Sequence, residues 1–305
     1  MIKLALFATL LFSSLGQAKI KLAITVDDLP KHSELPSGTN RKEVAEKMLA
    51  AFKSHNIVEV YGFINAEPLK SDPSLDEVLK LWTSFSYPLG NHSYSHQSLN
   101  KISAQDFERE IELNEETLKR HSHDQDWHFF RYPYLHEGEN LEKRNLIRTY
   151  LKEKSYKIAQ VTIDFADWSW NEPYARCLNA KNLKAIAWLK KSYLTCASDQ
   201  LHRADKISRA LFKKQGAQIL LLHIGAFDAE MIPALLELYK KEGVEFITLA
   251  DALKDSSYTI DPGFTSVGGS EFTYQILKSR GLKLKDIGMA PYAHYPEKKL
   301  TTICR

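Results

Sequence analysis

The chain has 305 residues, of which 44% are hydrophobic and 26% are charged, and its formal net charge at pH 7 is +3. This composition is typical of a globular protein with ample apolar material for a core. Because basic and acidic residues nearly balance, the charge makes no electrostatic case for binding nucleic acid, and no such partner is expected.

The first residues have the layout of a secretory signal peptide. Lys3 supplies a positive charge, residues 4–15 are almost wholly apolar, and Gly16-Gln17-Ala18 places small residues where signal peptidase reads them. The apolar run is too short to span a bilayer comfortably, and no later segment is apolar enough for a membrane helix. We therefore expect residues 1–18 to be removed near Ala18, a secreted or periplasmic mature protein, and no integral membrane segment.

Apolar runs typical of strands alternate with helical stretches along most of the chain. In chain order we expect strand 20–26, helix 41–55, strand 58–63, helix 74–85, a short strand ending at Gly90, helix 103–121, strand 128–131, helix 141–154, strand 157–163, a largely helical stretch 179–215, strand 218–222, helix 229–242 and strand 244–248. Asn40 and Ser103 are placed to cap the first and third helices.

This alternation predicts parallel strands joined by crossover helices. About seven strand–helix units favour an α/β fold, a distorted or incomplete (β/α)7 barrel with a C-terminal extension, over a small open sheet. Beyond residue 254 turn sequences follow, and Ser270 is placed to cap an amphipathic helix ending near Gly281. We expect a main domain over residues 19–254 and an extension, 255–305, packed on it.

Three cysteines are present, Cys177, Cys196 and Cys304. An exported chain can form disulfides, and an odd count leaves at least one thiol outside an intramolecular pair. Cys177 and Cys196 lie in one segment, so they are the expected pair.

Two segments suggest a metal site. Asp27 and Asp28 follow an apolar strand, and such a pair of like charges raises one pKa unless a cation neutralises it. His92 and His96 are spaced so that both rings lie on the same face of a helical turn. Together with a carboxylate they supply three ligands and leave positions open for water and substrate, as a catalytic zinc needs.

Three further segments carry polar residues near predicted strand ends: Arg131-Tyr132-Pro133-Tyr134, Asp164-Phe165-Ala166-Asp167-Trp168, and His223 after residues 219–222. Each has a plain structural explanation when taken alone, as a surface salt bridge, as packing, or as a buried core histidine. In a site, an arginine would hold a carboxylate by a forked hydrogen bond, and an acidic side chain would orient a histidine.

In this order the five segments resemble the five motifs of the polysaccharide deacetylase family, the NodB-homology group of family-four carbohydrate esterases. The matching segments are Thr25-Val26-Asp27-Asp28, His92-Ser93-Tyr94-Ser95-His96, Arg131 to Tyr134, Asp164 to Trp168, and Leu220 to His223. Any one motif is weak evidence, but the ordered set, which spans roughly residues 20–253, is highly specific. Within the family, the chain is expected to be similar to peptidoglycan N-acetylglucosamine deacetylases, with residues 19–254 as the catalytic domain.

The resemblance implies a divalent metal bound by Asp28, His92 and His96, with Zn²⁺ as the default and Co²⁺, Ni²⁺, Mn²⁺ or Fe²⁺ as alternatives. It implies six further roles: Asp27 as general base, His223 as general acid, Arg131 and Asp167 as the residues that orient these two, the backbone N–H of Tyr134 as oxyanion donor, and Trp168 as a wall of the acetyl pocket. A separate acid is needed because an amine leaves an amide poorly unless it is protonated.

The expected reaction is removal of N-acetyl groups from a cell-wall glycan, with peptidoglycan first and chitin-like oligosaccharides next. An O-acetyl esterase acting on xylan, an inactive glycan-binding module, and a non-haem iron oxygenase remain as alternatives. His136 lies next to the third motif and is expected to face substrate. Surface positions are expected for the other histidines: His32, His55, His121, His123, His202 and His294.

Overall fold

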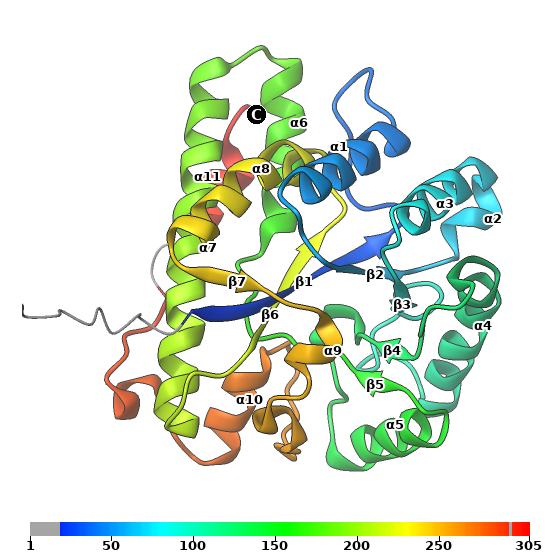
Figure 1. Ribbon diagram of the computed structural model, residues 1–305, viewed down its shortest axis with the longest axis vertical. Coiled ribbons are helices and arrows are strands. Elements are labelled where there is room, and N and C mark those ends of the chain that lie inside the picture. The colour runs from blue at the N-terminus through cyan, green and yellow to red at the C-terminus, as the bar shows by residue number, and fades with distance from the viewer. Residues whose placement is uncertain (1–18, 293–294) are drawn as a thin grey trace, which may run out of the picture.

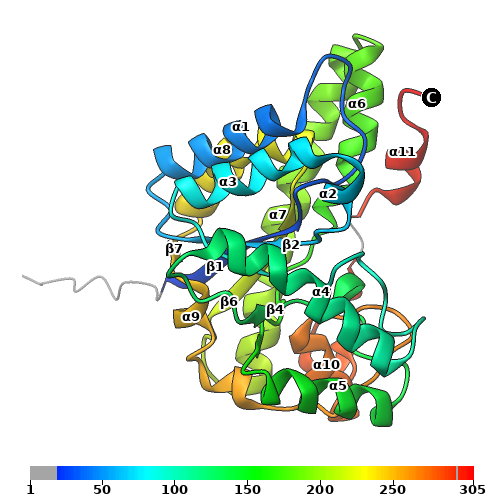
Figure 2. The ribbon, with the colours of Figure 1, turned by 90° about the vertical axis from the view of Figure 1, so that its right-hand side faces the viewer.

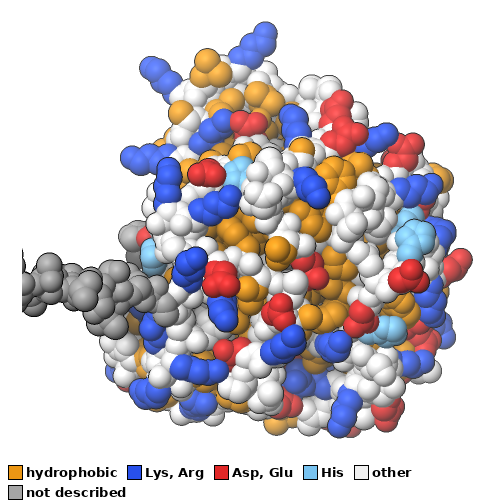
Figure 3. Space-filling view, in the orientation of Figure 1, with side chains coloured by type: hydrophobic (Ala, Val, Ile, Leu, Met, Phe, Trp, Pro, Cys, Tyr) orange, Lys and Arg blue, Asp and Glu red, His pale blue; other side chains and the backbone are white. Residues whose placement is uncertain are grey.

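The computed structural model describes residues 19–292 and 295–305 (Figure 1). The expected signal peptide, residues 1–18, and His294 lie outside the described residues. Within them, no helix combines the length and the apolar character needed to cross a membrane. On the face in Figure 3, basic and acidic side chains are interspersed, in keeping with the small net charge.

The described residues form a sheet of seven strands around the long strand β1, Ile20–Leu29. The path β5-β4-β3-β2-β1-β6 is parallel throughout, and β7 also pairs with β1 in parallel. The other strands are β2 (Val60–Ile64), β3 (Leu89–Asn91), β4 (Phe129–Phe130), β5 (Lys157–Ile158), β6 (Gln218–His223) and β7 (Val244–Phe246).

The helices cover the outside of this sheet, and α8, α1, α3, α4 and α5 follow one another around it in Figure 1. The longer helices are α1 (Arg41–Ser54), α3 (Asp76–Ser84), α4 (Ala104–Ser122), α5 (Leu141–Glu153), α6 (Asn171–Asn179), α7 (Leu183–Phe212) and α8 (Ala226–Lys241). The shorter ones are α2 (Pro68–Ser71), α9 (Leu249–Ala252), α10 (Phe272–Ser279) and α11 (Glu297–Thr302).

The sheet curls into an incomplete barrel, as predicted. Residues 159–163 leave the short strand β5 and cross to β6, so that the Ala159 N–H donates to Phe130 while Ile163 bridges Leu220. The predicted strand 157–163 is therefore wrong beyond residue 158, because its second half turns to join the two edges of the sheet. Helix α8, which the sequence predicts to begin at residue 229, begins at Ala226.

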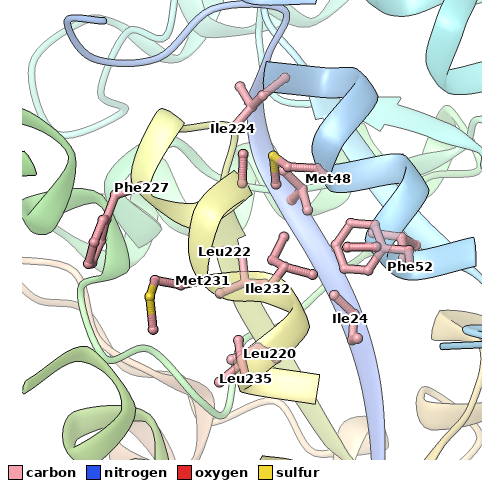
Figure 4. Packing of buried hydrophobic residues seen from close by; sticks show 14 of the residues in the cluster. Ile24, Met48, Phe52, Leu220, Leu222, Ile224, Phe227, Met231, Ile232 and Leu235 are labelled. Carbon is pink, nitrogen blue, oxygen red and sulfur yellow. The ribbon is translucent and has the colours of Figure 1, made fainter. Parts of the chain in front are cut away.

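The core lies on both faces of β1 and β6. Because these parallel strands are covered on both sides, their apolar runs are continuous, without alternation between apolar and polar residues. Figure 4 shows α1 and α8 above these strands, with Met48 and Phe52 of α1 meeting Ile24 and Ile232. Each such buried side chain stabilises the fold by about 1.5–3 kcal/mol relative to an exposed one. The predicted caps Asn40 and Ser103 are confirmed: their side chains accept from the backbone N–H groups of Glu43 and Asp106.

The predicted disulfide is wrong, because Cys177 is bonded to Cys304 and Cys196 lies buried in α7. Cys177 is near the end of α6, whereas Cys196 is well along α7, and the two helices pack together. At 1.5 Å per residue the two positions are offset by about 15 Å along the helix pair, well beyond disulfide reach. The disulfide instead anchors the C-terminal segment, and Figures 1 and 2 both place α11 beside α6.

The extension packs on α7 through α10, where Phe272, Ile276 and Leu277 share an apolar cluster with Ile207 and Leu211. The N-cap of α10 is Glu271, whose side chain makes no capping bond, so the capping predicted for Ser270 is wrong. The division into residues 19–254 and 255–305 stays a prediction.

The close approach of strands β2, β3 and β4 requires glycine at residue 90. A Cβ at Gly90 would lie 2.7 Å from Phe63 Cε1 and 2.9 Å from the carbonyl oxygen of Phe129. We expect Gly90→Ala to lower the free energy of unfolding by about 1–3 kcal/mol, measured by urea titration, because the added methyl overpacks the core. Gly268→Ala is the matched control, since nothing lies within 4 Å of its Cβ position; equal stabilities of the two variants would contradict this account.

Candidate active site

The five motif segments meet at the carboxyl ends of the parallel strands. Asp27 of β1 is paired in register with His223 of β6, while His92 and Arg131 directly follow β3 and β4. Loops after such strands gather at one end of a barrel, which is where active sites of these folds lie. Each of the five segments contributes side chains to the lining of one pocket of about 640 Å³.

Asp28, His92 and His96 converge as a candidate metal site. Asp28 Oδ1 lies 3.5 Å from His92 Nε2 and 3.3 Å from His96 Nε2, and the three ligand atoms all lie within 4.8 Å of one another. Asp28 Oδ1 is buried and has no hydrogen-bond partner among the described residues. This orphaned oxygen and two ring nitrogens form a donor set that fits a divalent transition ion.

The protonation states of these groups also fit a metal. His92 Nδ1 lies 2.8 Å from the Arg131 carbonyl oxygen, which can only accept, so Nδ1 carries the proton and Nε2 presents its lone pair. Burial and the neighbouring His92 lower the pKa of His96 to about 4. Burial alone would raise the pKa of Asp28, but a hydrogen bond from His32 and the neighbouring rings of His92 and His96 hold it well below the usual value. At neutral pH Asp28 is therefore a carboxylate and His96 a neutral imidazole, as metal binding requires.

The segment from His92 to His96 is an irregular loop and not the helical turn predicted from the spacing. Ser93 and His96 have φ values of 62° and 56°, in the left-handed region that non-glycine residues rarely adopt. Buried amides hold this conformation: Asn65 Nδ2 donates to the carbonyl oxygens of His92 and Ser93, and Asn91 Oδ1 accepts from the Ser93 N–H. The rings are brought together by this loop rather than by helix geometry.

Asp27 is held by a buried arginine. Arg131 Nη1 lies 3.3 and 3.2 Å from the two carboxylate oxygens of Asp27, Nη2 donates to Thr25 Oγ1, and Nε donates to the Ala159 carbonyl. Arg131 and Asp27 are 1% and 2% exposed, so each charge depends on the other for compensation. The guanidinium thus fixes the orientation of the carboxylate beside the candidate metal site.

His223 is held on the other side of the pocket by Asp167. One Asp167 oxygen lies 2.9 Å from His223 Nδ1 and the other accepts the His223 backbone N–H at 2.7 Å, which leaves Nε2 for the pocket. Burial by itself lowers the pKa of His223, but the carboxylates of Asp167, Asp28 and Asp27 raise it to about 10. His223 is therefore protonated at neutral pH, as a general acid must be.

A further buried carboxyl group, Asp228, supports Asp167 and was not identified from the sequence. Asp228 is 0% exposed and accepts hydrogen bonds from Tyr193 Oη and Asn171 Nδ2, each at 2.8 Å. Burial, and then the charge of Asp167, raise the pKa of Asp228 well above its ordinary value. A neutral Asp228 can donate a hydrogen bond to Asp167, which holds the Asp167 side chain in place. An acidic residue within an apolar helix was the only signal in the sequence.

His32 was expected at the surface, and this expectation is wrong. Its Nδ1 lies 2.7 Å from Asp28 Oδ2, and its ring centroid is 5.0 Å from that of His223. The chain turns sharply after β1, so a residue four positions beyond Asp28 returns to the pocket. His121 is also buried, bonded to Asp76. His136 bonds to Ser98 and is not among the residues that line the pocket.

The remaining predicted residues lie at the rim. Tyr134 and Trp168 are 56% and 47% exposed and line the pocket. The extension forms the facing wall with Gly269, Ser270 and Glu271, and a Cβ at Gly269 would collide with the Tyr134 carbonyl oxygen. This contribution was not predicted, since nothing in the sequence relates residue 269 to residue 134.

Glu271 and Asp164 both line the pocket, adding two carboxyl groups that carry raised pKa values. Burial, and then the charge of Asp164, raise the pKa of Glu271 to about 7, while burial raises that of Asp164. The pocket therefore carries carboxyl groups from the extension and from the fourth motif as well as from β1.

Comparisons with known proteins agree with this geometry. Residues 16–150 match the family model for polysaccharide deacetylase. A peptidoglycan-N-acetylglucosamine deacetylase of Bacillus cereus is 29% identical over 150 residues, which cover 49% of this chain and 47% of that relative. The chain thus matches about half the length of this relative.

Solved structures share the fold. A mutant pseudoenzyme of carbohydrate esterase family four with restored enzymatic activity gives a TM-score of 0.52 at 16% identity, covering 77% of this chain and 68% of that one. A peptidoglycan N-acetylglucosamine deacetylase gives 0.51 at 22% identity, covering 77% and 88%. The predicted family resemblance is confirmed by the match of residues 16–150 to the polysaccharide deacetylase model, and Asp167 and His223 lie beyond the matched segment.

The Asp228 network predicts a contrast between two substitutions. Asp228→Ala should lower the free energy of unfolding by about 2–4 kcal/mol, because the buried groups of Tyr193, Asn171 and Asp167 lose their partner. Asp228→Asn should cost less than about 1 kcal/mol, since its amide still accepts one hydrogen bond and donates another. Urea unfolding curves measure both, and equal losses would argue against the network.

Proposed function

We propose that the protein is an exported, metal-dependent deacetylase that removes N-acetyl groups from a cell-wall glycan, with N-acetylglucosamine of peptidoglycan as the first substrate. One observation carries the proposal: the Asp28–His92–His96 set lies between an arginine-held carboxylate, Asp27, and a carboxylate-held imidazolium, His223. A hydrolysis that needs a base for water and an acid for the leaving group requires such an arrangement.

The proposed metal is zinc, which suits two imidazoles and one carboxylate, although Co²⁺, Ni²⁺, Mn²⁺ and Fe²⁺ accept the same ligands. A divalent ion held by Asp28, His92 and His96 would lower the pKa of water and would polarise the acetyl carbonyl. Asp27 would take a proton from the attacking water while Arg131 keeps its carboxylate oriented. The water oxygen bonds to the acetyl carbon, and the C–N bond then breaks.

His223 would give its Nε2 proton to the departing nitrogen, so the products are acetate and a free amine. Asp167 stabilises the charged imidazole before this transfer and fixes its direction. The Tyr134 backbone N–H would donate to the oxyanion, and Trp168 would form a wall beside the acetyl methyl group. Tyr134 has a φ of 58°, a strained conformation of the kind that occurs at functional sites.

The choice of substrate rests on the name of the Bacillus cereus relative and on the expected export of the chain. The presence of pseudoenzymes among the structural relatives raises the alternative of an inactive glycan-binding module. Against that alternative, both Asp27 and His223 are present and line the same pocket. Acetate release from purified peptidoglycan, chitin oligomers and acetylated xylan, each with and without chelator, tests the proposal; no release from any substrate by metal-loaded protein would refute it.

Loss of either acid–base residue should strongly reduce turnover without unfolding the protein. We expect Asp27→Asn and His223→Ala each to reduce acetate release by about 10²–10⁴-fold, the usual contribution of a positioned acid or base. Asp251→Asn, at an exposed position far from the pocket, is the matched control and should keep full activity. Circular dichroism checks folding; near-normal turnover in both site variants would remove the acid–base assignment.

The pH profile of the reaction should depend on Asp167. A general acid works in its protonated form, so activity falls as the pH rises through the pKa of His223, which Asp167 raises. Asp167→Asn removes the largest charge that raises this pKa while burial still lowers it, so we expect the alkaline limb of kcat/KM to move to lower pH by more than about one unit. An unchanged alkaline limb would mean that His223 does not supply the proton.

A further inference from the structure

A second pocket, of about 420 Å³, opens beside the first and shares His32 and Trp168 with it. We call it the tail pocket and define it by Trp168, Glu172, Arg176, Tyr295, Glu297 and Arg305. One wall comes from α6 and the opposite wall from the C-terminal segment around α11. The two pockets are therefore contiguous, with the half-exposed ring of Trp168 at their junction.

The C-terminal wall is a fixed part of the molecule. The Cys177–Cys304 disulfide joins it to α6, and Arg176 Nη2 donates to the carbonyl oxygens of Leu300 and Ile303 at 3.0 and 3.4 Å. Leu300 is 2% exposed and belongs to the main core cluster. A wall anchored by a covalent bond, two hydrogen bonds and a buried side chain can present a preformed binding surface.

The chemistry of the tail pocket suits an uncharged polyhydroxy ligand. Two aromatic residues, Trp168 and Tyr295, offer apolar ring faces, and the Tyr295 ring is held at 5.8 Å from that of Trp170. Glu172 and Glu297 are balanced by Arg176 and Arg305, so neither a cation nor an anion is favoured by net charge. A sugar ring has an apolar C–H face and a rim of hydroxyl groups that carboxylates and guanidinium groups can bond.

Two nitrogens at the walls lack partners. His32 Nε2 and Arg176 Nε are both buried and make no hydrogen bond within the described residues. Unsatisfied buried polar groups are rare in folded proteins and call for an explanation. A ligand hydroxyl reaching each nitrogen after a small side-chain rotation would supply the missing partner.

We propose that the tail pocket is a second sugar-binding subsite, which holds the neighbour of the sugar whose acetyl group lies in the main pocket. The inference rests on the proposed function, because it takes the same glycan chain as ligand. The strand of sugars would cross Trp168 from one pocket to the other. The C-terminal extension would then select for polymeric over small acetylated substrates.

The test compares a glycan with a small acetyl ester that fills only the main pocket. With the metal-loaded full chain, Tyr295→Ala and Glu297→Ala should raise KM for the N-acetylglucosamine tetramer so that kcat/KM falls about tenfold, with kcat little changed. Hydrolysis of 4-methylumbelliferyl acetate should stay within about twofold. Glu245→Ala, an exposed substitution on β7, is the matched control. Unchanged tetramer kinetics, or an equal loss on both substrates, would overturn the subsite.

A binding measurement separates this inference from the proposed function. Isothermal titration calorimetry of the chelator-treated protein with the tetramer should give an affinity that Tyr295→Ala weakens about tenfold. If the wild type binds the tetramer in this way but releases no acetate when metal-loaded, the subsite stands and the deacetylase proposal falls. If acetate is released and the variant binds as well as the wild type, the subsite falls alone. A wild type that does not bind the tetramer also overturns the subsite.

Discussion

Two adjacent carboxylates lie at the buried end of β1, and the rest of the site compensates their negative charge. Asp27 and Asp28 are 2% and 9% exposed, and like charges so close together in a poorly solvated place need compensation. Arg131 supplies it for Asp27, and three histidines surround Asp28. The functional groups on the neighbouring strands are thus the same groups that allow β1 to end in two charges inside the fold.

The same electrostatics separates the roles of the histidines. His96 shares the Asp28 carboxylate with His92 and His32, so burial and the nearby His92 outweigh that charge and keep His96 neutral and able to bind a metal. His223 has Asp167 bonded to its ring and is kept charged. A buried neutral Asp228 behind Asp167 completes this second arrangement. One pocket therefore contains neutral and protonated imidazoles, because carboxylates are distributed unequally around them.

The C-terminal extension is part of the site rather than an appendage. Its first half presses Gly269 against Tyr134 and places Glu271 in the main pocket, and its second half walls the tail pocket. The disulfide to α6 and the packing of α10 on α7 anchor both halves to the helix pair that follows the fourth motif. The α6–α7 helix pair and the C-terminal extension both lie outside the regular alternation of strands and helices. They are thus joined to each other and to the pocket.

The sequence by itself determined the alternating architecture, the caps at Asn40 and Ser103, and the family resemblance, because these depend on local periodicity and on short ordered motifs. It also pointed to the nine site residues, whose strand-end positions bring them to one end of a parallel sheet. Only the tertiary structure decided the return of His32, the support from Asp228, the partner of Cys177 and the walls from the extension. These contacts depend on where the turns, helix ends and chain reversals fall in space. The spacing of residues along the sequence does not specify which distant side chains they bring together.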